Sequence, residues 1–150
     1  MRGRLLVWPL LAVVIAGLAW QTARLRSRLL ASELVNEVEV VSLSVATSNP
    51  ALLPRVLPGN LTALRRAADA DPVAVEVPLS RGSLFLLIRR PHEAIESYRR
   101  ALALEPHPEI YLHLGDALLA AGKVGEARDA YRSAVLLDPW LRVAVPGGIL

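Results

Sequence analysis

The second half of the chain repeats itself at a spacing of 33 residues, and this repeat limits the fold more than any other feature of the sequence. Five positions with small, aromatic or proline side chains recur in register: Gly82, Ala94, Tyr98, Ala101 and Pro106 are followed by Gly115, Ala127, Tyr131, Ala134 and Pro139. The neighbouring text recurs as well, because Leu-Glu-Pro closes the first unit and Leu-Asp-Pro closes the second. A repeat of this length is typical of solenoids, in which each unit buries its apolar face against the next.

The pattern resembles the tetratricopeptide repeat, a hairpin of two helices about 34 residues long with the signature W-x2-L-G-x2-Y…A-x3-F…A-x4-P. Residues 108–139 match most closely, with Tyr111 in the tryptophan position, followed by Leu114, Gly115, Leu118, Ala127, Tyr131, Ala134 and Pro139. Residues 75–106 match through Gly82, Phe85, Ala94, Tyr98, Ala101 and Pro106, although Pro78 and Arg81 replace two apolar positions. Residues 61–72 carry only the second-helix spacing, in Leu64, Ala67 and Pro72. The resemblance implies an all-α fold, a short solenoid of helix hairpins over residues 61–145.

The small residues of the repeat are expected to let neighbouring helices approach closely. Gly115 and Ala127 stand where the two helices of one hairpin should meet, and Ala134 where that hairpin should meet the next. Tyr98 and Tyr131 are the large side chains expected to fill the space between helices. We therefore assign repeat packing to Gly82, Ala94, Tyr98, Ala101, Tyr111, Leu114, Gly115, Ala127, Tyr131 and Ala134.

Two complete units are fewer than the three or so that such a solenoid usually needs to bury a continuous core. We expect residues 61–71, together with part of 29–47, to supply the missing layer. Gly122 follows a predicted helix end, where the backbone needs a left-handed residue, and Arg89 replaces this glycine in the earlier unit. At the C-terminal end, the apolar residues 140–143 indicate either contact with a partner or another copy, or a local fold-back. Residues 146–150 are expected to form a tail.

The region before the repeats divides into a predicted helix and a predicted loop. Over residues 24–48, apolar residues spaced by three or four share one helix face: Leu30, Leu34, Val38, Val41 and Val45. This amphipathic connecting helix either packs under the repeats or serves as a stalk or dimerising helix. Frequent valine makes a strand over residues 38–46 the alternative. Three prolines at 50, 54 and 58 predict a loop over residues 49–60.

The N-terminus carries a long apolar segment. Leu5 to Trp20 contains no charged side chain, and residues 5–23 would form a helix of roughly 28 Å, close to the thickness of a bilayer core. We therefore predict a single transmembrane helix over residues 1–23, which anchors the chain in a membrane. The alternatives are a cleaved signal sequence and a buried core helix. Flanking arginines nearly balance, and we expect the repeat domain to lie outside the cytoplasm.

The sequence contains no pattern typical of catalysis, cofactor binding or metal binding. It has no cysteine, which excludes disulfides and thiolate metal sites. None of the three histidines, His92, His107 and His113, has the spacing of a metal ligand, and His113 is expected to be a groove or surface residue. The arginines flank the apolar segment and lie on predicted helix faces rather than in one stripe, so nucleic-acid binding is not expected. We predict that the protein is not an enzyme.

In the family that the pattern resembles, partners usually bind the concave face formed by the first helices of the hairpins. By position, that face here would contain Leu79, Ser83, Leu86, Glu109, Leu112, Asp116 and Leu119. The family's peptide-carboxylate clamp uses lysine, arginine and asparagine at such positions, whereas this chain has Leu112 and Asp116. Such a face suits an amphipathic helix or a mildly basic peptide.

The predicted function is therefore a membrane-anchored protein-protein interaction module: an adaptor, or an assembly factor or subunit of a membrane or envelope complex, whose partner is another protein or a peptide. The first alternative is a purely structural subunit of a larger membrane assembly. The second is a secreted repeat protein released by signal cleavage.

Overall fold

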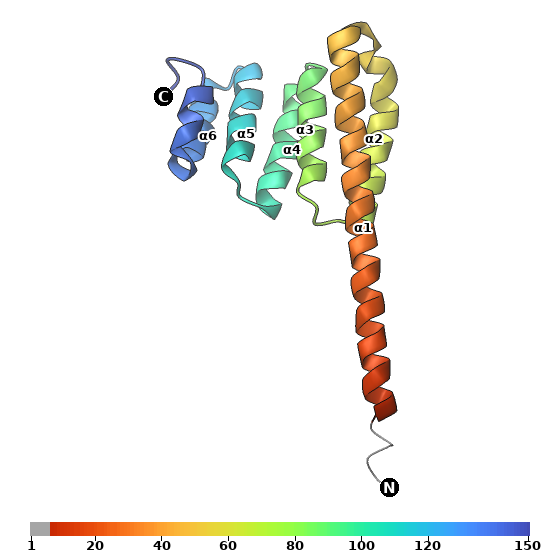
Figure 1. Ribbon diagram of the computed structural model, residues 1–150. Coiled ribbons are helices and arrows are strands. Elements are labelled where there is room, and N and C mark those ends of the chain that lie inside the picture. The colour runs from red at the N-terminus through yellow and green to blue at the C-terminus, as the bar shows by residue number, and fades with distance from the viewer. Residues whose placement is uncertain (1–6) are drawn as a thin grey trace.

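The computed structural model describes the backbone of residues 7–150 and the side chains of residues 11–150, and residues 1–6 lie outside the described part. The elements are α1 (Val7–Ser48), η1 (Pro50–Leu52), α2 (Leu53–Ala70), α3 (Glu76–Leu87), α4 (Pro91–Leu104), α5 (Pro108–Ala120), α6 (Val124–Leu137) and η2 (Pro139–Ala144), where η denotes a 3-10 helix. The described residues contain no strand. Three helix pairs, α1 with α2, α3 with α4 and α5 with α6, follow one another in chain order, and the N-terminal half of α1 extends well beyond them (Figure 1).

The repeats form two helix hairpins, α3 with α4 and α5 with α6. Pro91 and Pro108 begin α4 and α5, where the missing proline N–H has no intrahelical partner to lose. The first helices of both hairpins end in the same way. The N–H groups of Arg89 and Arg90 bond to the carbonyls of Leu86 and Phe85, and those of Gly122 and Lys123 bond to Leu119 and Leu118. This arrangement needs left-handed backbone, and φ is 59° at Arg89 and 76° at Gly122.

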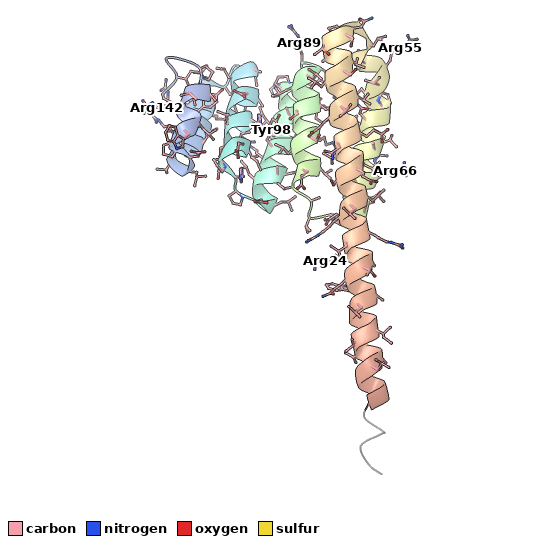
Figure 2. All side chains as sticks on the ribbon, viewed as in Figure 1. Arg24, Arg55, Arg66, Arg89, Tyr98 and Arg142 are labelled. Atoms are coloured by element: carbon pink, nitrogen blue, oxygen red, sulfur yellow. The ribbon has the colours of Figure 1, made fainter. Side chains whose placement is uncertain are left out.

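Two glycines touch the rings of the buried tyrosines. A Cβ added at Gly82 would lie 2.5 Å from Cε1 of Tyr98, and a Cβ added at Gly115 would lie 2.5 Å from Cε1 of Tyr131. Both tyrosines are almost fully buried, and Figure 2 shows Tyr98 inside the stack while Arg89 lies at its surface. The repeat of 33 residues thus places the same contact, between a tyrosine ring and the backbone of a glycine, in each of the two hairpins. Of the other predicted packing positions, only Tyr111 is half-buried, and the rest are buried.

The layer before the two hairpins consists of α1 and α2. Their buried side chains form one apolar cluster with the first residues of the stack: Ala31, Leu34, Val35, Val38, Leu64, Ala67, Val77 and Leu84. Residues 38–46 are helical, so the strand alternative is wrong. Of the five residues predicted to share one helix face, Leu34 and Val38 are buried, Val41 and Val45 are half-buried and Leu30 is exposed.

The predicted loop over residues 49–60 is wrong, because these residues form η1 and the first part of α2. Pro54 stands in the first turn of α2, where proline is compatible with a helix, but Pro58 stands inside it. Contacts with α1 offset the cost of this interior proline: Leu53 is buried, and the Asn60 side-chain amide donates a 2.8 Å hydrogen bond to Ser42 Oγ. Tertiary packing therefore overrides the local preference that three prolines express.

The predicted transmembrane segment lies within the first part of α1, except for its first residues, which fall outside the described part of the chain. Within the described residues, no helix has the combination of length and apolar character needed to cross a membrane. The transmembrane helix over residues 1–23 is therefore not supported by the structure.

The C-terminal residues partly fold back on the stack. Val145 and Ile149 pack against the core, and Arg128 Nε donates a 2.9 Å hydrogen bond to the carbonyl oxygen of Ile149. Trp140 and Val143 remain almost fully exposed. The tail thus covers only part of the last hairpin.

Candidate functional site

The seven residues predicted to form the partner-binding face come from two neighbouring first helices. Leu79, Ser83 and Leu86 follow one face of α3, and Glu109, Leu112, Asp116 and Leu119 follow one face of α5, because both sets are spaced by three and four residues. Ser83 and Glu109 are exposed, and the other five are half-buried. All four leucines pack against the core with part of their surface. Each helix thus offers partly exposed apolar side chains interleaved with polar ones.

Helix α1 adds a wall that the sequence interpretation did not assign to the site. Glu39, Ser42 and Leu43 line an open groove with a volume of ≈ 280 Å³, together with Ser80, Ser83, Leu84 and Leu87 of α3. Ser80 Oγ on α3 donates a 2.9 Å hydrogen bond to Glu39 Oε1 on α1, which joins the two sides of this groove. A sequence signal for this was present: a second helix at residues 61–72 requires a first helix before it, and α1 takes that position.

Two tyrosine hydroxyls reach from the second helices to the predicted face. The Tyr98 hydroxyl lies 3.2 Å from Ser83 Oγ, and the Tyr131 hydroxyl donates a 2.7 Å hydrogen bond to Asp116 Oδ1. Burial raises the pKa of Tyr98 to about 12, against the opposing effect of the Ser83 hydrogen bond and with a further increase from the Asp116 charge. Burial, followed by the Asp116 hydrogen bond and charge, raises the pKa of Tyr131 still more. Both phenols are therefore protonated at neutral pH, and Tyr131 fixes the orientation of the Asp116 carboxylate.

His113 belongs to the junction between hairpins. Its ring stacks on Tyr98, with the centroids 5.8 Å apart and the planes inclined by 18°. His107 pairs instead with the Glu109 carboxylate at the start of α5. Across the residues whose side chains are described, no group of three or more histidine, aspartate or glutamate side chains is arranged to hold a metal ion. Of the two histidines near the predicted face, His113 is thus held by an aromatic neighbour and His107 by a carboxylate.

The charge of this surface is negative. Glu39 contributes a carboxylate from α1, and Glu109 and Asp116 contribute two from α5. None of the seven predicted positions is a lysine or an arginine. A surface of leucine and carboxylate side chains complements a helix with an apolar face flanked by basic residues. We use the name concave face below for the seven predicted residues together with Glu39, Ser42 and Leu43.

Comparison with known proteins agrees with this architecture. A family model described as "Tetratricopeptide repeat" matches residues 61–102 and 79–140, which together cover more than half of the chain. Among solved structures, TTC0263, a thermophilic TPR protein of Thermus thermophilus, is 33% identical with a TM-score of 0.55, and the match covers 59% of this chain and 47% of that one. This chain therefore spans about half the length of the Thermus protein.

Two further structures share the fold at lower identity. The first TPR domain of human RPAP3 is 22% identical over 63% of this chain and 80% of that one, with a TM-score of 0.52. The MamA MSR-1 C2 structure is 22% identical over 84% of this chain and 73% of that one, with a TM-score of 0.54. No curated protein sequence matches the chain. The register of two helix hairpins, the glycine–tyrosine contacts and the family match lead to one conclusion: the chain belongs to the tetratricopeptide repeat family.

Proposed function

We propose that this protein is an interaction module whose concave face binds a basic amphipathic segment of a partner protein. The observation that carries the proposal is the pairing of partly exposed leucines with carboxylates on α1, α3 and α5. Leucines accept the apolar side of such a segment, and Glu39, Glu109 and Asp116 accept its basic side chains. Because Tyr131 already holds the Asp116 side chain in place, binding of the segment costs little conformational entropy at this carboxylate.

A charge-reversal experiment tests the concave face. A pull-down with the full chain, followed by mass spectrometry, identifies the partner, and fluorescence anisotropy then measures its affinity for the wild type and two variants. Glu109→Lys reverses an exposed charge on the concave face, whereas Asp129→Lys makes the same change at an exposed position on α6. We expect Glu109→Lys to weaken binding by about ten-fold, equivalent to roughly 1.4 kcal/mol, and Asp129→Lys to leave it unchanged. Equal effects of the two variants would show that only net charge matters and would refute the assignment.

We further propose that the N-terminal part of α1 holds the stack at a membrane, with the stack outside the cytoplasm. Support comes from the apolar sequence of residues 5–20 and from the exposure of Val13, Val14 and Trp20 in the described part. A bilayer would cover these side chains. Washing membranes with alkaline carbonate tests this: retention of the full chain in the pellet is expected, and its release into the wash would contradict the proposal. Protease treatment of intact and opened cells tests the orientation.

A second candidate function is a structural subunit whose repeats bind permanently to a larger assembly. The almost fully exposed Leu136, Trp140 and Val143 at the last hairpin favour this role, because an apolar surface of this kind is commonly an interface. Co-purification in a salt-resistant complex of fixed stoichiometry would support the structural role. Exchange of the bound segment against a competing peptide would support the adaptor.

A further inference from the structure

The part of α1 that projects beyond the repeats carries a regular row of exposed apolar side chains. Its members follow one another at intervals of four, three, four, three and four residues: Leu11, Ile15, Leu18, Thr22, Leu25 and Leu29. The five apolar members are 46%, 57%, 56%, 58% and 64% exposed, in chain order. We call this row the seam. A row of large apolar side chains this exposed is unusual unless something covers it.

The seam faces away from the repeats. Leu25 and Leu34 are nine residues apart, as are Leu29 and Val38, and nine residues make two and a half turns of an α-helix. Leu34 and Val38 are buried against the rest of the stack, so the seam residues point in the opposite direction. The straight course of α1 agrees with this geometry (Figure 1). At its C-terminal end the seam comes close to the stack, because Leu25 and Leu29 line an open cavity together with Asp71 and residues 73–75 of the connection between α2 and α3.

The spacing of the seam is that of a two-stranded coiled coil. Alternation of three and four residues gives a period of 3.5, and the seam assigns Leu11, Leu18 and Leu25 to d positions and Ile15 to an a position. In parallel coiled coils, leucine at d with a β-branched residue at a favours two strands over three or four. Between the seam residues, the helix carries small side chains at Ala12, Ala16, Gly17, Ala19 and Ala23, but also the exposed Val13, Val14 and Trp20. The seam can therefore pair with a second helix while Val13, Val14 and Trp20, which lie outside it, contact lipid as proposed above.

The charges at the end of the seam complement each other between two copies. In the same heptad assignment, Arg28 takes a g position and Glu33 takes the e position of the next heptad. In a parallel pair, the g residue of one helix lies beside that e residue of the other, so each Arg28 meets the Glu33 of the second copy. Both side chains are exposed, and Arg28 Nε also forms a 3.7 Å ion pair with Asp71 Oδ2 of its own chain, so in the pair Arg28 would lie between two carboxylates. Antiparallel helices would not bring these two positions together.

We propose that two copies of this chain associate in parallel through the seam, forming a coiled coil with one repeat stack on each outer side. Residues 11–29 supply just under three heptads, slightly fewer than the three to four that typify a coiled coil, and the Arg28–Glu33 contacts extend the pair. Thr22 takes an a position, where its hydroxyl donates a 2.9 Å hydrogen bond to the Ala19 carbonyl of its own helix. The two concave faces are then presented together, so a partner with two basic segments binds more tightly than a partner with one.

Single cysteine substitutions test the pairing, because the chain contains no cysteine of its own. Leu18→Cys and Leu25→Cys place a thiol on the seam, and Ala23→Cys places one at an exposed position off the seam. The full-length variants are oxidised with copper phenanthroline in the membranes of the expressing cells and again after purification, and then separated on a non-reducing gel. We expect both seam variants to form disulfide-linked dimers and Ala23→Cys to remain monomeric. Equal crosslinking of all three, or crosslinking of none, would overturn the proposal, and the second outcome would leave lipid as the cover of the seam.

Light scattering on the purified full chain provides the second measurement. The wild type is expected at twice the 16.3 kDa of one chain, and a Leu18→Ala, Leu25→Ala double variant at the mass of one chain. Alanine keeps a high helix propensity, so circular dichroism of the double variant should match that of the wild type. A wild type that stays monomeric at high concentration would contradict the proposal. A double variant that remains dimeric would place the interface elsewhere and contradict it equally.

Discussion

Replacing Gly115 by alanine should destabilise the repeat stack by about 2 kcal/mol, although alanine is the better helix former. The added Cβ would lie 2.5, 2.6 and 2.9 Å from Cε1, Cδ1 and Cζ of Tyr131. Contacts this short force a shift, and the Tyr131 ring is fully buried with its hydroxyl bonded to Asp116. Overpacking of this kind costs up to about 3 kcal/mol. The propensity gain from glycine to alanine returns roughly 1 kcal/mol.

The assay is thermal unfolding of the full chain followed by circular dichroism, in which 2 kcal/mol corresponds to a Tm decrease of roughly 4–8 °C for a chain of this size. Gly59→Ala in α2 is the control, because a Cβ at Gly59 meets nothing within 4 Å. The control should raise stability by about 0.5–1 kcal/mol. Truncating the ring in Tyr131→Leu should make the Gly115→Ala change less costly than it is in the wild type. If Gly115→Ala were as stable as the wild type, the ring contact would not be what requires glycine here.

Three further predictions follow from the same contacts. Arg89→Gly should raise the free energy of unfolding by about 0.5–1 kcal/mol, because φ is 59° at this residue and glycine adopts that conformation without strain. Arg90→Gly should lower the free energy of unfolding, because φ is −112° there and glycine only adds freedom to the unfolded chain. Urea unfolding measures both changes. The folded state holds the Tyr98 proton more tightly than the unfolded chain does, because the pKa is about 12 in the folded state and 10.0 in the unfolded chain. The free energy of unfolding should therefore be constant below pH 10 and fall between pH 10 and 12. A pH series of unfolding curves should show a smaller fall for Tyr98→Phe. Tyr131→Phe should lower the free energy of unfolding by roughly 1.5–3 kcal/mol, because the hydrogen bond to Asp116 is lost, while the far-ultraviolet circular dichroism spectrum stays unchanged. A decrease of less than about 0.5 kcal/mol would show that solvent replaces the hydroxyl as the partner of Asp116.

The hairpins were predictable from the sequence because one local requirement recurs in it. A glycine on the first helix must face a tyrosine on the second, and the distance along the chain from Gly82 to Tyr98 equals that from Gly115 to Tyr131. Such a contact can be predicted from the identities of the two residues and the number of residues between them. The same spacing placed Leu79, Ser83 and the α5 residues on their helices, although their role in binding stays a prediction.

The features that the sequence did not reveal depend on contacts between distant segments. Pro58 inside α2 is tolerated because Leu53 and Asn60 are buried on that helix, and no local pattern encodes this. Glu39 became part of the concave face through its hydrogen bond with Ser80, which lies 41 residues away. Reading the apolar N-terminus as a membrane span likewise rests on sequence alone, since the structure offers no spanning helix among its described residues.

Helix α1 runs for 42 residues without a break, from the projecting segment into the layer that begins the stack. At about 1.5 Å per residue it is a rod roughly 63 Å long, one end of which contributes Glu39, Ser42 and Leu43 to the concave face. No linker separates the two parts, so the repeats cannot swivel freely about their point of attachment. Any attachment that fixes the N-terminal end of α1 therefore also fixes the distance and the orientation of the concave face relative to that attachment. If the concave face binds a partner as proposed, the rigid connection restricts binding to segments that approach within a narrow range of directions.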